Sequence, residues 1–262
     1  MADSQFPWSF VAPVLLALPR IGAAIVVTPL FPTNLFPTLL RSTLAVSLSL
    51  YLYPHMAAAM PAAGLPLLAW IALLGKEVLI GMLLGFAVGS LVWAFEWAGG
   101  VIDLQVGFAN AQVFDPFGGH SAGPVGAFMM RIGVLLFVAG GGLQVLASLL
   151  FESFHLWPVT SFYPSTVRLA DFAGSSFRSL AELAARLVAP AVLLLALIDL
   201  GFGLVGRAVP QLNVFFFTMP LKGALAALML ALYLSYLADI AGAQISGLQV
   251  WLQRLVPVLA TP

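Results

Sequence analysis

The chain has 262 residues, of which 62% are hydrophobic and only 8% are charged. A soluble globular protein carries roughly 25% charged residues, and so few charges cannot cover a water-facing surface, which excludes an ordinary soluble domain. Ten Lys and Arg residues balance ten Asp and Glu residues, so no net charge attracts nucleic acid, and the lack of cysteine excludes disulfides, thiol nucleophiles and Cys-ligated metal sites.

Apolar stretches of membrane-spanning length recur along the chain. About 20 helical residues cross the hydrocarbon core of a bilayer, and continuous apolar runs without alternation favour helices over barrel strands. No Lys or Arg precedes Arg20, so we expect the first stretch to be a retained helix rather than a cleaved signal peptide. The sequence predicts an all-α polytopic membrane protein of about six hydrophobic helices in hairpins, near residues 8–28, 39–53, 65–95, 125–151, 187–207 and 214–238.

Two longer connections separate these predicted helices. Residues 96–124 contain two Gly-Gly pairs and the Asp115-Pro116 pair, which are typical of loops, and residues 160–186 form the most polar segment of the chain. Neither connection is polar enough to separate two domains. We therefore expect a single integral-membrane domain over residues 1–262.

Several charged residues interrupt the apolar stretches. A charge near the centre of a bilayer costs about 2.5–3.5 kcal/mol on insertion scales, so such residues normally face protein or water. Asp199 and Arg207 lie two helical turns apart, too far for direct pairing, which predicts partners on other helices or chains. For Arg131 and Arg207, extension of the side chain to the membrane interface is an equal alternative. The full set is Lys76, Glu77, Arg131, Asp199, Arg207 and Lys222.

Small residues form a stripe in the third predicted helix. Gly81, Gly85 and Gly89 recur at four-residue spacing, which places them on one helix face. Without a Cβ atom, this face allows another backbone to approach closely, as in small-xxx-small packing of membrane helices. The packing partner can lie within the chain or in another subunit, and the sequence favours neither.

Candidate enzymatic and metal sites lack the context that their chemistry needs. Residues 119–123 match the G-x-S-x-G pattern, but no strand precedes this Gly-rich connection, and a mobile loop accounts for it better. His55, His120 and His155 are scattered and form no metal-binding pair. The carboxylates of Glu96, Asp103 and Asp115 are too widely spaced for a dense cation loop. We therefore expect no catalysis and no cofactor.

A small secondary transporter is the alternative function. Such proteins use broken helices and charges at mid-membrane depth, and the chain has both features. It lacks two visibly matching halves, however, and six helices are few for a self-contained transporter.

Two sequence blocks resemble the signature regions of the FliR/SctT family of type III secretion export proteins. The first is AGGVIDLQVG at residues 98–107, continuing to FDP at residues 114–116. The second is DLGFGLVGR at residues 199–207, followed by PQLNVFFFTMPLK at residues 210–222, which contains Pro210, Gln211, Asn213 and Lys222. Arg20, Arg41 and the Lys76-Glu77 pair add support. The sequence FFFTMPLK is more similar to that of the injectisome branch than to that of the flagellar one.

The resemblance implies a place in an assembly. It implies one copy of this subunit joined to several SctR-like and SctS-like subunits in a conical export gate of the secretion basal body, in the bacterial inner membrane. An SctU-like switch protein would surround the cytoplasmic opening, and inner-rod, needle and other secreted proteins would pass through unfolded. The family also implies a fusion of an SctR-like part at about residues 1–180 and an SctS-like hairpin at about 181–262.

A plug for the closed channel is also implied by the resemblance, at residues 107–125. Aromatic side chains there would fill a lumen, and glycines would let the segment withdraw. Without the family, an ordinary surface loop is the better interpretation of this segment. The residues assigned to the plug are Gly107, Phe108, Asn110, Gln112, Phe114, Asp115, Pro116 and Phe117.

Overall fold

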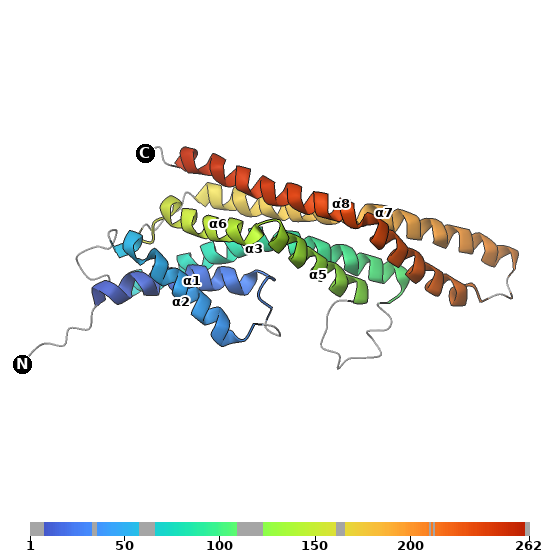
Figure 1. The fold of residues 1–262 in the computed structure, drawn as a ribbon, viewed down its shortest axis with the longest axis horizontal. Helices are drawn as coiled ribbons and strands as arrows, with labels where there is room; N and C mark the ends of the chain where they lie inside the picture. The colour runs from blue at the N-terminus through green and yellow to red at the C-terminus, as the bar shows by residue number, and fades with distance from the viewer. Residues whose placement is uncertain are drawn as a thin grey trace, which may run out of the picture. The chain divides into compact units, whose positions relative to one another are not determined.

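The structure of the protein, a computed structural model, consists of helices throughout the part of the chain that it describes (Figure 1). That part comprises residues 8–32, 36–57, 66–108, 123–160, 166–209, 211 and 213–259. Within it no strand occurs, which confirms the predicted all-α class. The helices are α1 (Trp8–Val27), α2 (Thr38–Ala57), α3 (Leu67–Val106), α5 (Pro124–Ala139), α6 (Gly142–Leu156), α7 (Thr166–Ala208) and α8 (Val214–Leu259).

The helix boundaries differ from the prediction in four main places. The last helix, predicted to end near residue 238, continues to Leu259. The predicted helix 125–151 is two helices, because Gly140 and Gly141 separate α5 from α6 and Gly141 adopts a left-handed φ of 79°. Residues 96–106, predicted as a connection, continue α3. The polar segment is likewise helical from Thr166 onward, because it buries Leu180 and Leu183 along one side of α7 while its charged residues lie elsewhere.

Fewer helices than six qualify as membrane spans. In the described residues, three segments are long and apolar enough to cross a bilayer: Leu67–Val106, Ala173–Ala208 and Phe216–Leu248. They become four if α5 and α6 together form one broken span. The apolar part of α1 (Val11–Val27) is shorter, and α2 carries Arg41 together with several Ser and Thr residues. The prediction of six spans is therefore not confirmed.

The helices form two compact units. The first unit comprises residues 1–90, 142–177 and 247–262, and the second comprises residues 91–141 and 178–246. The hydrophobic core of the first unit lies where α1 and α2 meet the start of α3 and the end of α6. It contains Leu16, Ile21, Ile25, Ala45, Leu52, Leu73 and Phe154, with Trp70 and Phe151 packed against it.

In the second unit, α7 and α8 pair as antiparallel helices. Gly206 lies beside Val214 near the connection, Asp199 pairs with Lys222 further along, and Leu183 and Ile240 line a common pocket. Each helix contributes a row of buried residues at spacings of three, four or seven, as expected for a helix that buries one face. The rows are Leu180, Leu183, Leu187, Ala191 and Leu195 on α7, and Ala226, Leu230, Leu237, Ala241 and Ile245 on α8.

Candidate functional site

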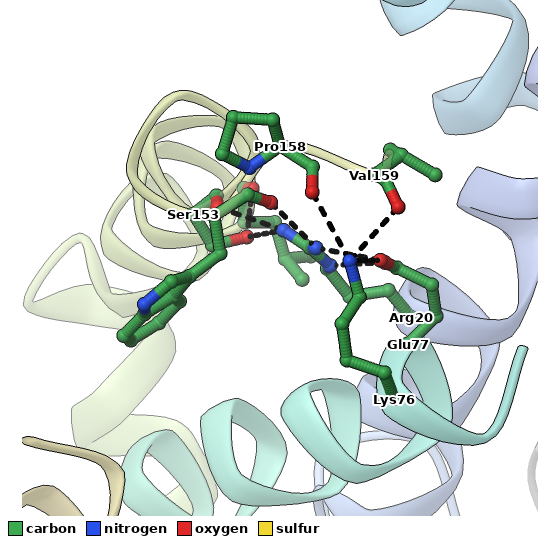
Figure 2. Close-up of polar contacts among 8 residues, drawn as sticks. Arg20, Lys76, Glu77, Ser153, Pro158 and Val159 are labelled. Carbon is green, nitrogen blue, oxygen red and sulfur yellow. Dashed lines mark hydrogen bonds and ion pairs between the residues drawn. The ribbon is translucent and has the colours of Figure 1, made fainter. Parts of the chain in front are cut away.

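A cluster of three charged residues is buried in the first unit (Figure 2). Arg20 of α1 and Glu77 of α3 form a two-pronged ion pair, with Nε donating to Oε2 at 2.6 Å and Nη2 donating to Oε1 at 3.0 Å. Both side chains have 0% exposure. Lys76 Nζ lies 2.8 Å from the same Oε1 atom. One carboxylate therefore balances two cations, and paired geometry of this kind gives strong, directional hydrogen bonds.

The remaining donors of the two cations bind the carboxyl end of α6. Arg20 donates to the carbonyl oxygens of Ser153 at 2.7 Å and Trp157 at 2.9 Å. Lys76 donates to those of Pro158 at 3.0 Å and Val159 at 2.9 Å. Ser153 lies in the last turn of α6, and the other three residues follow the helix directly. The partial negative charge of these four carbonyl oxygens offsets the second cation. The cluster thus fastens α1, α3 and the end of α6 together.

The glycine stripe of α3 lies on the same face as Glu77 and packs against α1 of the same chain. A Cβ atom at Gly81 would overlap the carbonyl oxygen of Arg20, and one at Gly85 would lie 2.6 Å from the carbonyl oxygen of Ala24. At Gly89 it would lie 2.7 Å from the ring of Pro29. Real Cβ atoms do not approach so closely, so glycine is required at these positions. The close helix approach brings Arg20 within reach of Glu77.

A second polar site joins α7, α8 and the end of α3 in the second unit. Lys222 of α8 forms an ion pair with Asp199 of α7 and donates to the carbonyl oxygen of Gln105 at 2.9 Å. The Lys222 side chain is 9% exposed, whereas the Asp199 side chain is 46% exposed. The ion pair joins α7 to α8, and the hydrogen bond to Gln105 holds the last turn of α3 against them.

A cleft of about 520 Å³ opens beside this ion pair. Its wall combines the last turn of α3, the glycine-rich end of α7 and the first turns of α8. The residues include Gln105, Gly107, Asp199, Gly203, Gly206, Asn213, Thr218 and Lys222. The two sequence blocks that resemble the FliR/SctT signatures therefore meet at one place in the fold.

Asp103 supplies a contact that the sequence did not reveal. It is 3% exposed in α3, and its carboxylate accepts hydrogen bonds from the backbone N–H groups of Val125 at 3.1 Å and Gly126 at 2.8 Å. These N–H groups belong to the first turn of α5. The N-cap residue of this helix, Gly123, has no side chain that could bond them. Asp103 therefore caps a helix that begins more than 20 residues later in the chain. In the sequence, Asp103 stood out only as part of the first signature block and as one of three widely spaced carboxylates, and neither indicated a helix cap.

The other predicted site residues are placed as follows. Gly107 ends α3 with a left-handed φ of 95°, and Phe108 lies beside Gly223 of α8. Arg207 and Gln211 are exposed near the α7–α8 connection, as is Asn213. Outside the described residues lie Asn110, Gln112, Phe114, Asp115, Pro116, Phe117 and Pro210. Among the residues that the structure covers, no group of three or more His, Asp and Glu side chains is arranged to hold a metal ion.

Comparison with known proteins identifies the family. The sequence model of the family described as bacterial export proteins, family 1, matches residues 11–248. The chain is 34% identical to the Yop proteins translocation protein T of Yersinia pestis over 93% of its length and 94% of that protein's. It is 35% identical to the flagellar biosynthetic protein FliR of Bacillus subtilis, over 61% of this chain and 62% of that protein.

The similarity extends to a longer flagellar alignment as well. The chain is 30% identical to FliR of Pectobacterium carotovorum, over 88% of this chain and 84% of that protein. A match over nearly the whole chain, together with the convergence of both signature blocks on one cleft, settles the assignment. The chain belongs to the FliR/SctT family of bacterial export proteins.

Proposed function

We propose that this protein is a core subunit of the export gate of a type III secretion system, the channel through which unfolded proteins leave the cell. The observation that carries the proposal is the meeting of the two signature blocks at the cleft beside Asp199 and Lys222. Blocks about 90 residues apart in the sequence share this one structural location, and the family match extends across both.

The apolar surface of the second unit supports a role inside an assembly. In the most apolar 18-residue window of each helix, only 11% of the window is buried within the protein in α7 and 22% in α8. Lipid alone is a poor cover for this surface, because Asp199 is half exposed in the middle of the apolar part of α7, and a charge in lipid costs about 2.5–3.5 kcal/mol. Protein neighbours with polar groups of their own meet the requirement better.

We assign those neighbours by family. The gate places SctR-like and SctS-like subunits around this chain in the bacterial inner membrane, with an SctU-like switch protein at its cytoplasmic side. The part at about residues 1–180 corresponds to the SctR-like fold, and residues 181–262 correspond to the SctS-like hairpin. The antiparallel pairing of α7 with α8 supports the second assignment.

We place the chain in the injectisome branch. The alignment with the Yop translocation protein, at 34% identity, covers 93% of the chain. The flagellar alignments cover less of it, 61% at 35% identity for the Bacillus protein and 88% at 30% for the Pectobacterium protein. The sequence FFFTMPLK at residues 215–222 supports the same branch. Inner-rod and needle proteins and other secreted proteins are then the substrates, and the chain itself catalyses no reaction.

The plug of the closed gate is assigned to residues 107–125. The first end of this segment is seated on the cleft-forming helices, since Gly107 lines the cleft and Phe108 lies beside α8. Deletion of residues 110–120 is expected to make the assembled gate leak ions, measured as loss of growth or of membrane potential in cells that produce the complex. Unchanged conductance in this strain would contradict the plug assignment.

The test of the proposed function is purification of the tagged chain in mild detergent from cells that encode the whole secretion system. A gate subunit is expected to elute in one large complex together with its two smaller helical membrane partners. The control is the same tag on an unrelated membrane protein of similar size. A uniform monomer or dimer that binds a small solute would instead establish a secondary transporter.

A further inference from the structure

One side of α7 carries a row of exposed leucines with a charged residue at each end. Helical spacing places Arg207 at one end of this row and Arg186, together with Glu182, at the other. Ala189 is exposed as well and continues the row between Arg186 and the leucines. Every leucine of the row is more than half exposed: Leu193, Leu197, Leu200 and Leu204.

The leucine row has the length of a bilayer core. From Arg186 to Arg207 the helix rises about 31 Å, and the hydrocarbon core of a bilayer is about 30 Å thick. Arginine side chains at such positions extend to the headgroup layers. Asp199 does not lie in this row, because it pairs with Lys222 of α8. This side of α7 therefore fits lipid, and the side that carries Asp199 fits protein.

Aromatic residues of α8 mark the same level as Arg186. Tyr233 and Tyr236, whose ring centroids lie 4.6 Å apart, precede Ile240 by two turns and one turn of the helix. Ile240 and Arg186 line a common pocket between α8 and α7. Because tyrosine is enriched where a membrane meets water, the pocket lies at the depth of the lipid headgroups.

This pocket of about 210 Å³ has a polar lining. Ser179, Glu182 and Arg186 of α7 contribute to it, together with Gln244 of α8. Glu182 precedes Arg186 by four residues, a spacing at which opposite charges commonly pair on a helix. Within the described residues, however, neither side chain has an ion-pair or hydrogen-bond partner. One anion and one cation thus line the pocket without neutralising each other.

A phospholipid with an ethanolamine headgroup complements these two charges. A guanidinium group binds phosphate oxygens through parallel N–H groups, and a carboxylate accepts hydrogen bonds from a primary ammonium group. A choline headgroup has no N–H group to offer Glu182, and an anionic headgroup without an amine is repelled by it. The next charges along the two helices, Arg178 and Asp239, also balance each other.

We propose that the pocket lined by Ser179, Glu182, Arg186 and Gln244 binds the headgroup of phosphatidylethanolamine, whose acyl chains lie along the leucine row of α7. Arg186 binds the phosphate, and Glu182 binds the ammonium group. The inference requires only that the chain lies in a bilayer, so it does not depend on a role in an export gate.

The test measures which lipids the protein retains. The tagged protein, with the partners that accompany it, is reconstituted into nanodiscs that contain equal amounts of phosphatidylethanolamine, phosphatidylglycerol and phosphatidylcholine. It is then extracted in mild detergent, and the lipids that remain bound are counted per chain by mass spectrometry. The unaltered protein is expected to retain phosphatidylethanolamine in several-fold excess over each of the other two lipids.

Two variants separate the roles of the charges. Arg186→Gln removes the group that binds phosphate and is expected to lower the retained phosphatidylethanolamine several-fold. Glu182→Gln leaves the Arg186 cation in place and is expected to shift retention several-fold toward phosphatidylglycerol, a gain that misfolding would not produce. Arg207→Gln is the matched control, because it removes an exposed arginine from the opposite end of the same row. It is expected to leave the retained lipids unchanged.

The inference fails if the unaltered protein shows no excess of phosphatidylethanolamine, or if Arg186→Gln retains as much of it. Equal loss in Arg207→Gln would also overturn it, because any arginine at the membrane surface would then suffice. Loss of a partner subunit without loss of lipid in Arg186→Gln would show that protein fills the pocket instead. These outcomes are independent of the proposed function, since bound lipid is counted whether or not the chain forms a gate.

Discussion

Arg20, Lys76 and Glu77 illustrate how few charged residues can organise an apolar protein. Removing one member of a buried ion pair is costly, about 3–5 kcal/mol, because it leaves the other charge without compensation. The three residues differ in this respect. Loss of Arg20 leaves Glu77 with Lys76 at 2.8 Å, whereas loss of Glu77 removes the carboxylate that pairs with both cations.

Glu77→Leu is therefore expected to destabilise the protein by about 3–5 kcal/mol. Adding Arg20→Met should restore part of the loss, because the stranded guanidinium is removed, and the double variant should cost less than the sum of the single variants by about 1–3 kcal/mol. Denaturant unfolding of the purified complex in detergent measures this coupling. Arg131→Met, at an exposed position of α5, is the control and should stay within about 0.5 kcal/mol of the unaltered protein. Strict additivity of Arg20 and Glu77 would refute the coupling.

The sequence located these charges but did not identify their partners. Hydropathy shows that a charge in an apolar stretch needs compensation, and Lys76, Glu77, Asp199 and Lys222 all stood out for that reason. Glu77 pairs with Arg20 and Lys76, and Asp199 pairs with Lys222. The cations also bind backbone carbonyls that lie 82 to 137 residues away along the chain. A carbonyl oxygen is present in every residue and leaves no trace in composition or spacing, so only the fold reveals which one is used.

At the scale of the helices, the glycines of α3 lie in two opposite environments, one with open space beside the Cα atom and one with another backbone against it. A glycine in a helix interior costs about 1 kcal/mol relative to alanine, so replacement usually stabilises. Where the space is filled by another backbone, the added methyl group forces the two helices apart. Gly75 lies in open space, whereas Gly85 lies against Ala24 of α1. The same substitution at these two positions therefore separates helix propensity from helix packing.

Gly75→Ala is expected to raise the free energy of unfolding by about 0.5–1 kcal/mol, and Gly85→Ala to lower it by about 1–3 kcal/mol. The opposite signs are the diagnostic result. Thermal unfolding of the two variants, prepared in the same detergent, measures the difference. A stabilising effect of both substitutions would show that α1 does not restrict α3 at Gly85.

Helix extent was the part of the fold that the sequence predicted least well. The apolar cores of six segments were found, because apolar runs of suitable length are conspicuous. The polar start of α7 was taken for a connection, since its charged residues conceal the buried row that includes Leu180, Leu183 and Leu187. Gly99 likewise suggested a loop, although it serves the contact between α3 and α5. Glycine marks both turns and tight packing, and the sequence alone does not separate the two.

At the scale of the whole molecule, Asp199 connects the fold of the chain to its assembly. Its carboxylate pairs with Lys222 and is also 46% exposed. One part of the group is therefore used within the chain, while another part remains open to a neighbouring subunit. If the chain is a gate subunit as proposed, a residue in this position is expected to affect assembly first and transport second.

Asp199→Ala is expected to reduce the yield of intact complex several-fold, because Lys222 loses its counter-charge and the exposed part of the carboxylate is removed as well. The amount of partner subunits recovered with the tagged chain measures the effect. Asp239→Ala, which removes an exposed carboxylate from α8, is the control and should leave the yield unchanged. Intact complexes that no longer secrete would place Asp199 in the transport pathway instead.

The hydrogen bonds from Arg20 and Lys76 to the end of α6 and the residues after it have a consequence for biosynthesis. Arg20 and Ser153 are separated by 133 residues, which a ribosome adds in about 7–27 s at the usual rate of about 5–20 residues per second. Glu77 emerges first and can pair with Arg20, but the carbonyls that complete the cluster do not yet exist. For this interval the nascent chain carries an uncompensated cation among apolar helices. The contacts that complete the cluster can therefore form only after α6 and the residues that follow it have been made.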